Sequence, residues 1–398
     1  MHPHFQAREL VGTLQRAALA LAIASCLAFA SDPLFEETDV FAGGQDNINT
    51  YRIPSVVCTR KGTVLAFCEG RKDRSQDGSP THLALKRSTG NSGEWNPPGR
   101  PGARGGGRSR ERNMTWQPLE IVLASRTTEA YVNPVPVIDE STGAIYLLVN
   151  YYLHYDTHVD AFGGRGQVWI LRSTDEGATW SEPVDITSSV GNKELGPGIG
   201  IQMRNGRLVA PVYDGVIYSD DHGKTWRAGS KTPTPPNESQ VVELADSSLM
   251  FNVRGGSRRT IVLSRDGGAT WGEPHQDPVL TDSELWGGCQ ASLIRYTRKE
   301  AQGMDRLLFA NPADLKDRFD LTVRLSYDEG KTWPVARMVK KGTGGYSSMT
   351  VFPDGSIGVL FETGNSYDGI VEPHAKLAFA HFNLEWLTDG KDHLRNEH

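Results

Sequence analysis

Short runs of β-branched and aromatic residues alternate with polar turns along most of the chain. Runs at 168–172, 260–263 and 321–325 contain residue types that favour strands, and a turn rich in Ser, Asp and Gly follows each of them. The 3.6-residue hydrophobic period of a long amphipathic helix is absent from the body of the chain. The pattern therefore predicts an all-β protein.

One eight-residue phrase, Ser-x-Asp-x-Gly-x-Thr-Trp, follows four of the predicted strands, and we name it the Asp-box. Intact copies occupy 173–180, 219–226, 264–271 and 326–333, and a damaged copy begins at Ser88. The Asp can accept backbone N–H groups in a hairpin turn, the Gly supplies a positive φ, and we expect the Trp to pack under its own hairpin. Such repetition indicates one supersecondary unit that is used several times.

The spacing of the Asp-boxes favours one repeat architecture. Their serines follow one another at steps of 46, 45 and 62 residues, which suits β-propeller blades of about four short strands. A solenoid would have a shorter and more even repeat. Residues 31–390 would supply about six blades of about 60 residues. We expect a six-bladed β-propeller with four intact Asp-boxes and one degenerate box.

Composition narrows the classes of function. The formal net charge is −6, so the chain lacks the basic surplus on which nucleic-acid binding depends. Three cysteines, Cys58, Cys68 and Cys289, remain after residue 30, and their odd number and spacing argue against a disulfide framework or a cysteine metal site. We interpret them as buried small apolar residues.

Residues 1–30 have the features of an export signal. Arg8 and Arg16 precede the short apolar run 17–24, and Ala-Phe-Ala at 28–30 offers a cleavage site. The run is too short to span a bilayer. Because residues 23–26 loosely resemble a bacterial lipoprotein box, a lipid anchor is the alternative to free secretion. We expect a secreted, periplasmic or cell-surface protein without a membrane span.

A Gly/Pro/Arg-rich stretch at 96–112 interrupts the damaged Asp-box. Removal of residues 95–114 would leave a nearly regular box with one extra residue. We therefore interpret 95–114 as a disordered insertion in the first Asp-box hairpin. The alternative is a basic arm that binds an anionic polymer.

The segment 154–160 contains two histidines and two aspartates, and could be read as a metal site. On a strand these side chains would alternate between faces, and no distant partner residue is evident. We favour a polar loop at the rim of the propeller and expect neither a metal nor a cofactor.

Three arginines stand outside the Asp-boxes. Arg52 lies in Tyr-Arg-Ile-Pro, Arg254 in Phe-Asn-Val-Arg-Gly-Gly, and Arg318 eight residues before the last box serine. An isolated arginine beside a strand is usually solvated or paired with a carboxylate. The combination of Tyr-Arg-Ile-Pro with serial Asp-boxes, however, resembles the exo-α-sialidase (neuraminidase) family of six-bladed propeller glycoside hydrolases. The likeness covers nearly all of residues 45–385 apart from the insertion.

The resemblance implies a carboxylate-binding site. In the family, three arginines clamp the carboxylate of sialic acid, and Arg52, Arg254 and Arg318 match them. The second of these follows a glutamate by sixteen residues, as Arg254 follows Glu238 here. A planar guanidinium suits this task because it stays charged and binds carboxylate bidentately. Three mutually repelling cations would leave an empty site strained and selective for an acidic ligand.

The resemblance also implies the catalytic residues. Tyr346, in Gly-Gly-Tyr-Ser-Ser, matches the nucleophile, and Glu238 matches the base that takes its proton. Glu243 would face the other way on an alternating strand. Asp77, eleven residues before Ser88, matches the acid/base on a mobile loop, with Asp73 as its competitor.

Supporting residues follow from the same family pattern. Glu362, in Leu-Phe-Glu, would orient Arg52. Arg71 would lie near the sugar 4-hydroxyl, and Asn133 would make a neighbouring polar contact.

This set implies hydrolysis of terminal α-linked sialic acids from glycoproteins, glycolipids or oligosaccharides, with net retention. A neutral phenol avoids the repulsion that an anionic carboxylate would meet beside the sugar's own carboxylate, and sialidases are an exception to the two-carboxylate scheme. Asp77 would protonate the leaving oxygen and then activate water.

Other functions stay open at this point. A non-catalytic sialoglycan-binding propeller would keep the arginines but lose Tyr346, Glu238 or Asp77, and a box-bearing receptor domain would lack the three arginines. Within the enzyme class, a transferase or a hydrolase of deaminated sialic acids is possible, since neither acceptor sites nor the pocket for the 5-substituent is legible in the sequence.

Overall fold

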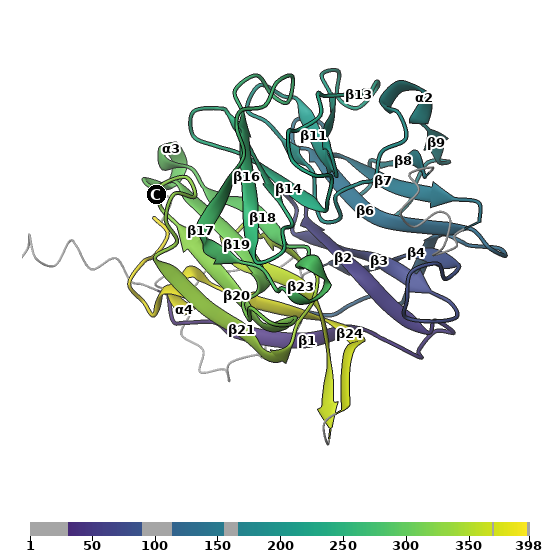
Figure 1. Cartoon of the computed structure of the whole chain (residues 1–398). Helices are drawn as coiled ribbons and strands as arrows, with labels where there is room; N and C mark the ends of the chain where they lie inside the picture. The colour runs from purple at the N-terminus through teal and green to yellow at the C-terminus, as the bar shows by residue number, and fades with distance from the viewer. Residues whose placement is uncertain (1–30, 90–113, 155–165, 368–369, 396–398) are drawn as a thin grey trace, which may run out of the picture.

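The computed structural model describes residues 31–89, 114–154, 166–367 and 370–395. The predicted signal, most of the predicted insertion and most of the segment 154–160 lie outside these ranges. Within them the chain is mostly β-structure arranged as a propeller (Figure 1), so this part of the prediction is confirmed. The described helices are short, the longest having five residues, and none of them could cross a bilayer.

The described strands form four four-stranded sheets and one eight-stranded sheet. The eight-stranded sheet consists of two four-stranded units, which are linked by one parallel residue pair between Thr81 and Ala130. The first unit contains β2 (Thr50–Cys58), β3 (Thr63–Arg71), β4 (Thr81–Thr89) and β5 (Glu120–Leu123). The second contains β6 (Ala130–Asp139), β7 (Ala144–Tyr152), β8 (Gln167–Ser173) and β9 (Val184–Asp185).

The next three sheets follow in chain order. They contain β10 (Ile201–Gln202), β11 (Leu208–Val212), β12 (Gly215–Ser219) and β13 (Arg227–Ala228); β14 (Ser239–Glu243), β15 (Leu249–Val253), β16 (Arg258–Ser264) and β17 (His275–Thr281); and β18 (Ser292–Thr297), β19 (Arg306–Pro312), β20 (Phe319–Ser326) and β21 (Val335–Thr343). The short helices are α2 (Thr187–Val190), η1 (Leu285–Gly287), α3 (Lys299–Gln302) and α4 (Leu384–Thr388).

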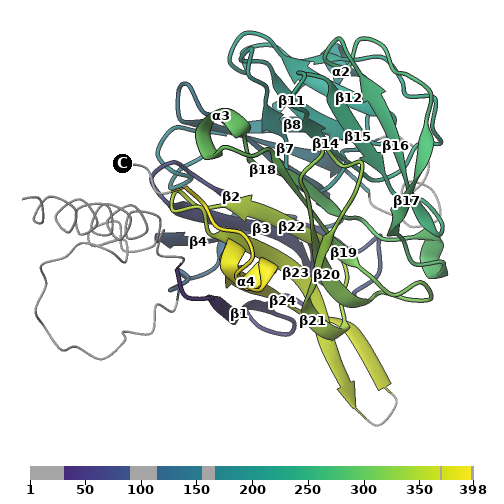
Figure 2. The same ribbon diagram turned by 90° about the vertical axis from the view of Figure 1, so that its left-hand side faces the viewer.

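The last sheet joins the two ends of the described chain. It contains β22 (Ser347–Val351), β23 (Ile357–Tyr367), β24 (Ile370–Phe382) and β1 (Phe35–Ala42), and β1 pairs antiparallel with β24. Because β1 comes from the N-terminal side, the first and last strands close the ring together. Figures 1 and 2 show β1 beside β24 in both views.

The core lies between adjacent sheets, as β3 illustrates. Val64, Ala66 and Cys68 join a buried cluster with residues of β23 and β24. The intervening Leu65 and Phe67 join a second cluster with residues of β7 and β8. Successive side chains of a strand point to opposite faces, so a strand that is apolar throughout can fill the cores on both sides of its sheet.

All four intact Asp-boxes make the same hydrogen bonds, which confirms the predicted turn. In each, the Ser hydroxyl donates to Oδ1 of the Asp at 2.8–2.9 Å, and the Thr N–H donates to the same oxygen at 2.8–2.9 Å. The Gly N–H donates to the Ser hydroxyl oxygen at 2.8–3.0 Å.

The box tryptophans pack on their own hairpins, as predicted, and also on the neighbouring sheet. The Trp226 indole N–H donates to the Gly223 carbonyl of its own box at 3.2 Å, and the rings of the other three box tryptophans lie beside the glycine of their own box. The box tryptophans also contact core clusters that contain residues of two neighbouring sheets: Trp180 lies 5.7 Å from the Phe67 ring of the preceding unit, and Trp226 lies 6.1 Å from Tyr146. The gap between two twisted sheets widens toward the rim, and an indole is large enough to fill it.

In the damaged box, the Ser88 hydroxyl donates to the Thr115 carbonyl at 2.9 Å, and Trp116 packs 5.4 Å from Phe379. Met114, the last residue of the predicted insertion, packs against the same core cluster. From residue 114 on, the described chain thus contacts Ser88 and the core again, through a hydrogen bond that the intact boxes do not make.

Candidate active site

Three of the predicted site residues lie on or directly before the inner strands of the propeller. Arg52 lies on β2, while Glu238 and Tyr346 directly precede β14 and β22. Around the axis β14 contacts β18, β18 contacts β22, and β22 contacts β2. Residues at the ends of these strands therefore meet although they are far apart in the sequence.

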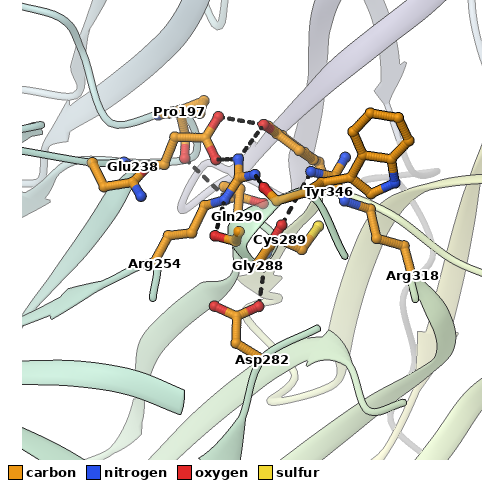
Figure 3. Close-up of polar contacts among 12 residues, drawn as sticks. Pro197, Glu238, Arg254, Asp282, Gly288, Cys289, Gln290, Arg318 and Tyr346 are labelled. Atoms are coloured by element: carbon orange, nitrogen blue, oxygen red, sulfur yellow. Dashed lines mark hydrogen bonds and ion pairs between the residues drawn. The ribbon is translucent and has the colours of Figure 1, made fainter. Parts of the chain in front are cut away.

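Tyr346, Glu238 and Arg254 form one hydrogen-bonded group (Figure 3). The Tyr346 hydroxyl donates to Oε1 of Glu238. Nη1 of Arg254 donates to Oε2 of Glu238 at 2.6 Å and to the Tyr346 oxygen at 3.1 Å. Burial and the Glu238 charge raise the pKa of Tyr346 well above its ordinary value, although the surrounding arginines oppose this. The phenol is thus neutral at rest and has a carboxylate ready to accept its proton.

Arg52 is held by Glu362 from β23. Its Nε and Nη2 donate to the two carboxylate oxygens at 3.0 and 3.2 Å. Glu362 also accepts the backbone N–H groups of Ile53 at 3.0 Å and Tyr346 at 3.2 Å. Burial by itself would raise the pKa of Glu362, but Arg52 and His374 hold it well below its ordinary value. The glutamate thus fixes both Arg52 and the backbone of Tyr346.

Arg318 completes the group of three arginines. Its Cζ lies 5.3 Å from the centre of the Tyr346 ring, and that of Arg52 lies 5.4 Å from it. Nη2 of Arg318 donates to the Gly288 carbonyl at 3.1 Å, while its buried Nε has no partner among the described residues. A buried N–H without an acceptor is costly, so this guanidinium is held at the expense of one unmet hydrogen bond.

A second cluster surrounds Arg71. Its Nη2 lies 2.8 Å from Oε2 of Glu69 and 2.7 Å from Oδ1 of Asp77. Oε1 of Glu69 accepts the Asn133 backbone N–H at 3.1 Å. The Asp77 side chain is 49% exposed, so it can still reach a ligand or water. For the competitor Asp73 the structure gives a contact of the backbone: its N–H donates to the Ser79 hydroxyl oxygen at 3.1 Å.

Two residues in unusual backbone conformations adjoin these clusters. Ile53 has φ 56° and Asn133 has φ 54°, each directly before a proline and at an irregularity in strand pairing. A positive φ is rare for a β-branched residue and costs on the order of 1–3 kcal/mol. At Ile53 the conformation lets its N–H reach Glu362, the carboxylate that holds Arg52.

The structure separates Glu243 from this site. It lies at the far end of β14 from Glu238, and its Oε2 accepts from Nη2 of Arg298 at 2.6 Å. The choice of Glu238 over Glu243 therefore agrees with the placement of both residues. Across the described ranges, no three potential metal ligands from His, Cys, Asp and Glu gather in one place.

Sequence reasoning missed several contributors. His374 lies 3.5 Å from Glu362, and Glu69 links Arg71 to Asn133. Glu69 stands two residues before Arg71 on β3, so the period-2 rule places both side chains on one face and could have indicated the pair. The carbonyls that hold Arg254 and Arg318 carry no sequence signal, because any residue supplies a carbonyl.

Comparisons with known proteins agree with this geometry. Residues 107–359 match the model of the BNR repeat-like domain. The sialidase of Micromonospora viridifaciens is 32% identical over 393 residues, which cover 89% of this chain and 55% of that protein. The exo-alpha-sialidase of Arthroderma benhamiae is 30% identical over 379 residues, which cover 86% and 85% of the two chains. The chain belongs to the sialidase family.

Solved structures of sialidases share its fold. The Hadza microbial sialidase Hz136 matches with a TM-score of 0.73 and 28% identity, over 88% of this chain and 69% of that one. The intramolecular trans-sialidase from Ruminococcus gnavus matches with a TM-score of 0.67 at 21% identity, over 88% and 98%. The six-bladed sialidase-like fold follows from these neighbours, whereas the chain spans only about half the length of the Micromonospora sialidase.

Proposed function

We propose that this sialidase-family chain is an exo-α-sialidase that hydrolyses terminal α-linked sialic acids with retention, through Tyr346 as nucleophile. Its substrates are sialylated glycoproteins, glycolipids or oligosaccharides. One observation carries the proposal: the Tyr346 hydroxyl donates to Glu238 while three arginines surround the same phenol ring or oxygen.

The arginines bind the substrate carboxylate. Three guanidinium groups, those of Arg52, Arg254 and Arg318, face the carboxylates Glu362 and Glu238, so the site keeps an excess positive charge. Binding at three points fixes the sugar ring above Tyr346 and brings its anomeric carbon to the phenol.

In the first step the Tyr346 oxygen attacks the anomeric carbon and the bond to the leaving oxygen breaks. Glu238 takes the phenol proton, and the Arg254 N–H that already points at this oxygen stabilises the developing negative charge. Asp77 gives a proton to the leaving oxygen. Because the phenol is neutral before attack, it does not repel the carboxylate of the substrate.

In the second step water attacks the anomeric carbon and Asp77 takes a proton from it. The bond to Tyr346 breaks, and the phenol regains its proton from Glu238. The two inversions give net retention. Arg71 supports Asp77 through their 2.7 Å contact, and we assign Arg71 and Asn133 to binding of the sugar's polar substituents.

The sequence supports two further parts of the proposal. The export features of residues 1–30 favour a secreted, periplasmic or cell-surface enzyme, with a lipid anchor as the alternative form of attachment. The fold is a six-bladed propeller with four intact Asp-boxes and a degenerate fifth that leads into Trp116.

The test is release of sialic acid from a fluorogenic sialoside by the purified chain. We expect activity in the wild type and a loss of about a thousandfold or more in kcat for Tyr346→Phe, which keeps the ring but removes the attacking oxygen. A wild type that binds the sialoside without cleaving it would favour the sialoglycan-binding alternative. Full activity of Tyr346→Phe would remove the proposed nucleophile.

A further inference from the structure

Three consecutive carbonyl groups hold two of the three arginines. Arg254 donates through Nη2 to the Trp286 carbonyl at 2.5 Å and through Nε to the Gly287 carbonyl at 3.2 Å. Arg318 donates through Nη2 to the Gly288 carbonyl at 3.1 Å. We name residues 282–289 the carbonyl loop. Figure 3 draws Asp282 and Gly288 of this loop together with Arg254 and Arg318.

Asp282 closes this loop on itself. Its Oδ1 accepts the backbone N–H groups of Ser283 at 3.1 Å and Cys289 at 2.7 Å, the second and the last residue of the loop. Its Oδ2 accepts the Gly255 N–H at 3.2 Å. Gly255 directly follows Arg254, so one buried carboxylate ties the loop to the backbone that carries the arginine.

A buried arginine neutralises Asp282 and braces the same loop. Nη1 of Arg259 donates to Oδ2 of Asp282 at 2.9 Å and to the Cys289 carbonyl at 2.7 Å, and its Nε donates to Asn252 at 2.7 Å. Both side chains of the pair are 1% exposed or less. A buried ion pair is a poor source of net stability, so its presence calls for another explanation.

The packing of the loop leaves little freedom. Gly288 has φ 94°, and a Cβ added there would lie 2.1 Å from the Gly255 carbonyl oxygen. The two backbone segments therefore touch at the point where Asp282 bonds to both. Because the loop is held rigidly, its three carbonyl acceptors keep the guanidinium groups of Arg254 and Arg318 oriented when no anion is bound.

We propose that Asp282 and Arg259 are positioning residues, which hold the carbonyl loop so that Arg254 and Arg318 are oriented for the substrate carboxylate before it binds. The inference rests on the proposed function, since it assigns these residues to the same site. Neither residue touches the reacting atoms in this account. Their effect is on the fraction of molecules in which both arginines are correctly placed, and this fraction scales the apparent affinity.

The test is Asp282→Asn, which keeps the size of the side chain but turns an amide N–H₂ or a neutral oxygen toward Arg259 and Gly255. We expect KM for the sialoside to rise about tenfold while kcat changes by less than about twofold, because a bound substrate restores the arginine geometry. The matched control is Asp392→Asn, which breaks another largely buried pair, Arg306–Asp392, with contacts of 2.8 and 2.7 Å. It should lower the melting temperature and leave KM unchanged.

A measurement without substrate separates this inference from the proposed function. The rate at which phenylglyoxal modifies Arg254, followed by mass spectrometry, should increase several-fold in Asp282→Asn and stay at the wild-type value in Asp392→Asn. An unchanged modification rate together with an unchanged KM would overturn the positioning role. A wild type that cleaves no sialoside would instead overturn the proposed function, while a faster modification of Arg254 would still support the positioning role.

Discussion

Glu362 binds Arg52 through two hydrogen bonds of 3.0 and 3.2 Å, although 310 residues separate them in the chain. The pair bridges β2 and β23, which belong to the first and the last sheets of the ring. The same carboxylate accepts the backbone N–H of Tyr346. One residue thus joins closure of the propeller to the position of the proposed nucleophile.

Glu362→Gln should therefore reduce both stability and substrate binding. The substitution leaves the buried Arg52 charge without its carboxylate, and breaking such a pair costs about 3–5 kcal/mol. We expect urea unfolding to show a loss of this size, together with a higher KM for the sialoside. The control is Glu37→Gln, which breaks the more exposed pair between Lys340 and Glu37 and should cost less than about 1 kcal/mol. Equal losses of unfolding free energy in the two variants would contradict the role of Glu362 in holding Arg52.

Arg318→Ala should weaken the binding of acidic ligands selectively. Hydrogen bonds between charged groups are worth about 1.5–3 kcal/mol each, so we expect the Kd of sialic acid to rise about tenfold to a hundredfold. The methyl ester of the same sugar, which lacks the negative charge, should be affected much less. Calorimetry with both ligands measures the difference. Arg337→Ala, which removes a positive charge from the Asp389 pair elsewhere, controls for net charge, and an equal effect on acid and ester would argue against the clamp.

The Asp-boxes should make stability depend on pH in acid. Hydrogen bonds from Thr and Ser lower the pKa of Asp175 and Asp266 to about 2, although burial opposes this shift. A carboxyl whose folded pKa is depressed stabilises the protein above its unfolded pKa, near 4, and this contribution is lost as the pH falls toward about 2. The variant with Asp175→Asn and Asp266→Asn should melt lower at pH 7 and show a flatter change of melting temperature between about pH 4 and pH 2. If the curves of melting temperature against pH ran parallel for wild type and variant, these carboxylates would not contribute to the pH dependence of stability.

The propeller could be predicted from the sequence because its signals are local. The Asp-box encodes its own turn through residues four positions apart, such as Asp175 and Thr179, and the spacing of the boxes gives the repeat length. The contacts of the box tryptophans with the neighbouring sheet could not be predicted in this way. Trp226 bonds its own hairpin at Gly223, but the contact of its ring with Tyr146 of the neighbouring sheet depends on how two sheets meet.

The candidate site could be predicted only in part. The family pattern indicated Arg52, Arg254 and Arg318, and the structure brings them together around Tyr346. Asp282 could not be identified from the sequence. It accepts three hydrogen bonds from backbone N–H groups and one from Arg259, which lies near the start of β16, away from the Asp-box at the end of that strand. Such contacts arise only in the folded chain, and neither a hydrophobic period nor a sequence motif indicates them.

Trp286, whose carbonyl accepts from Arg254, has a strained backbone conformation. Its φ is 65° and the residue is 70% exposed, so a large residue occupies a left-handed conformation with little burial to compensate. The left-handed region costs L-residues about 1–2 kcal/mol and is free of this cost for glycine. Trp286→Gly should therefore be more stable than Trp286→Ala by about 1 kcal/mol in urea unfolding. Met338, an exposed residue of β21, provides the matched pair, because Met338→Gly in an ordinary strand should be less stable than Met338→Ala. The same order of stability at both positions would show that the Trp286 backbone is unstrained in solution.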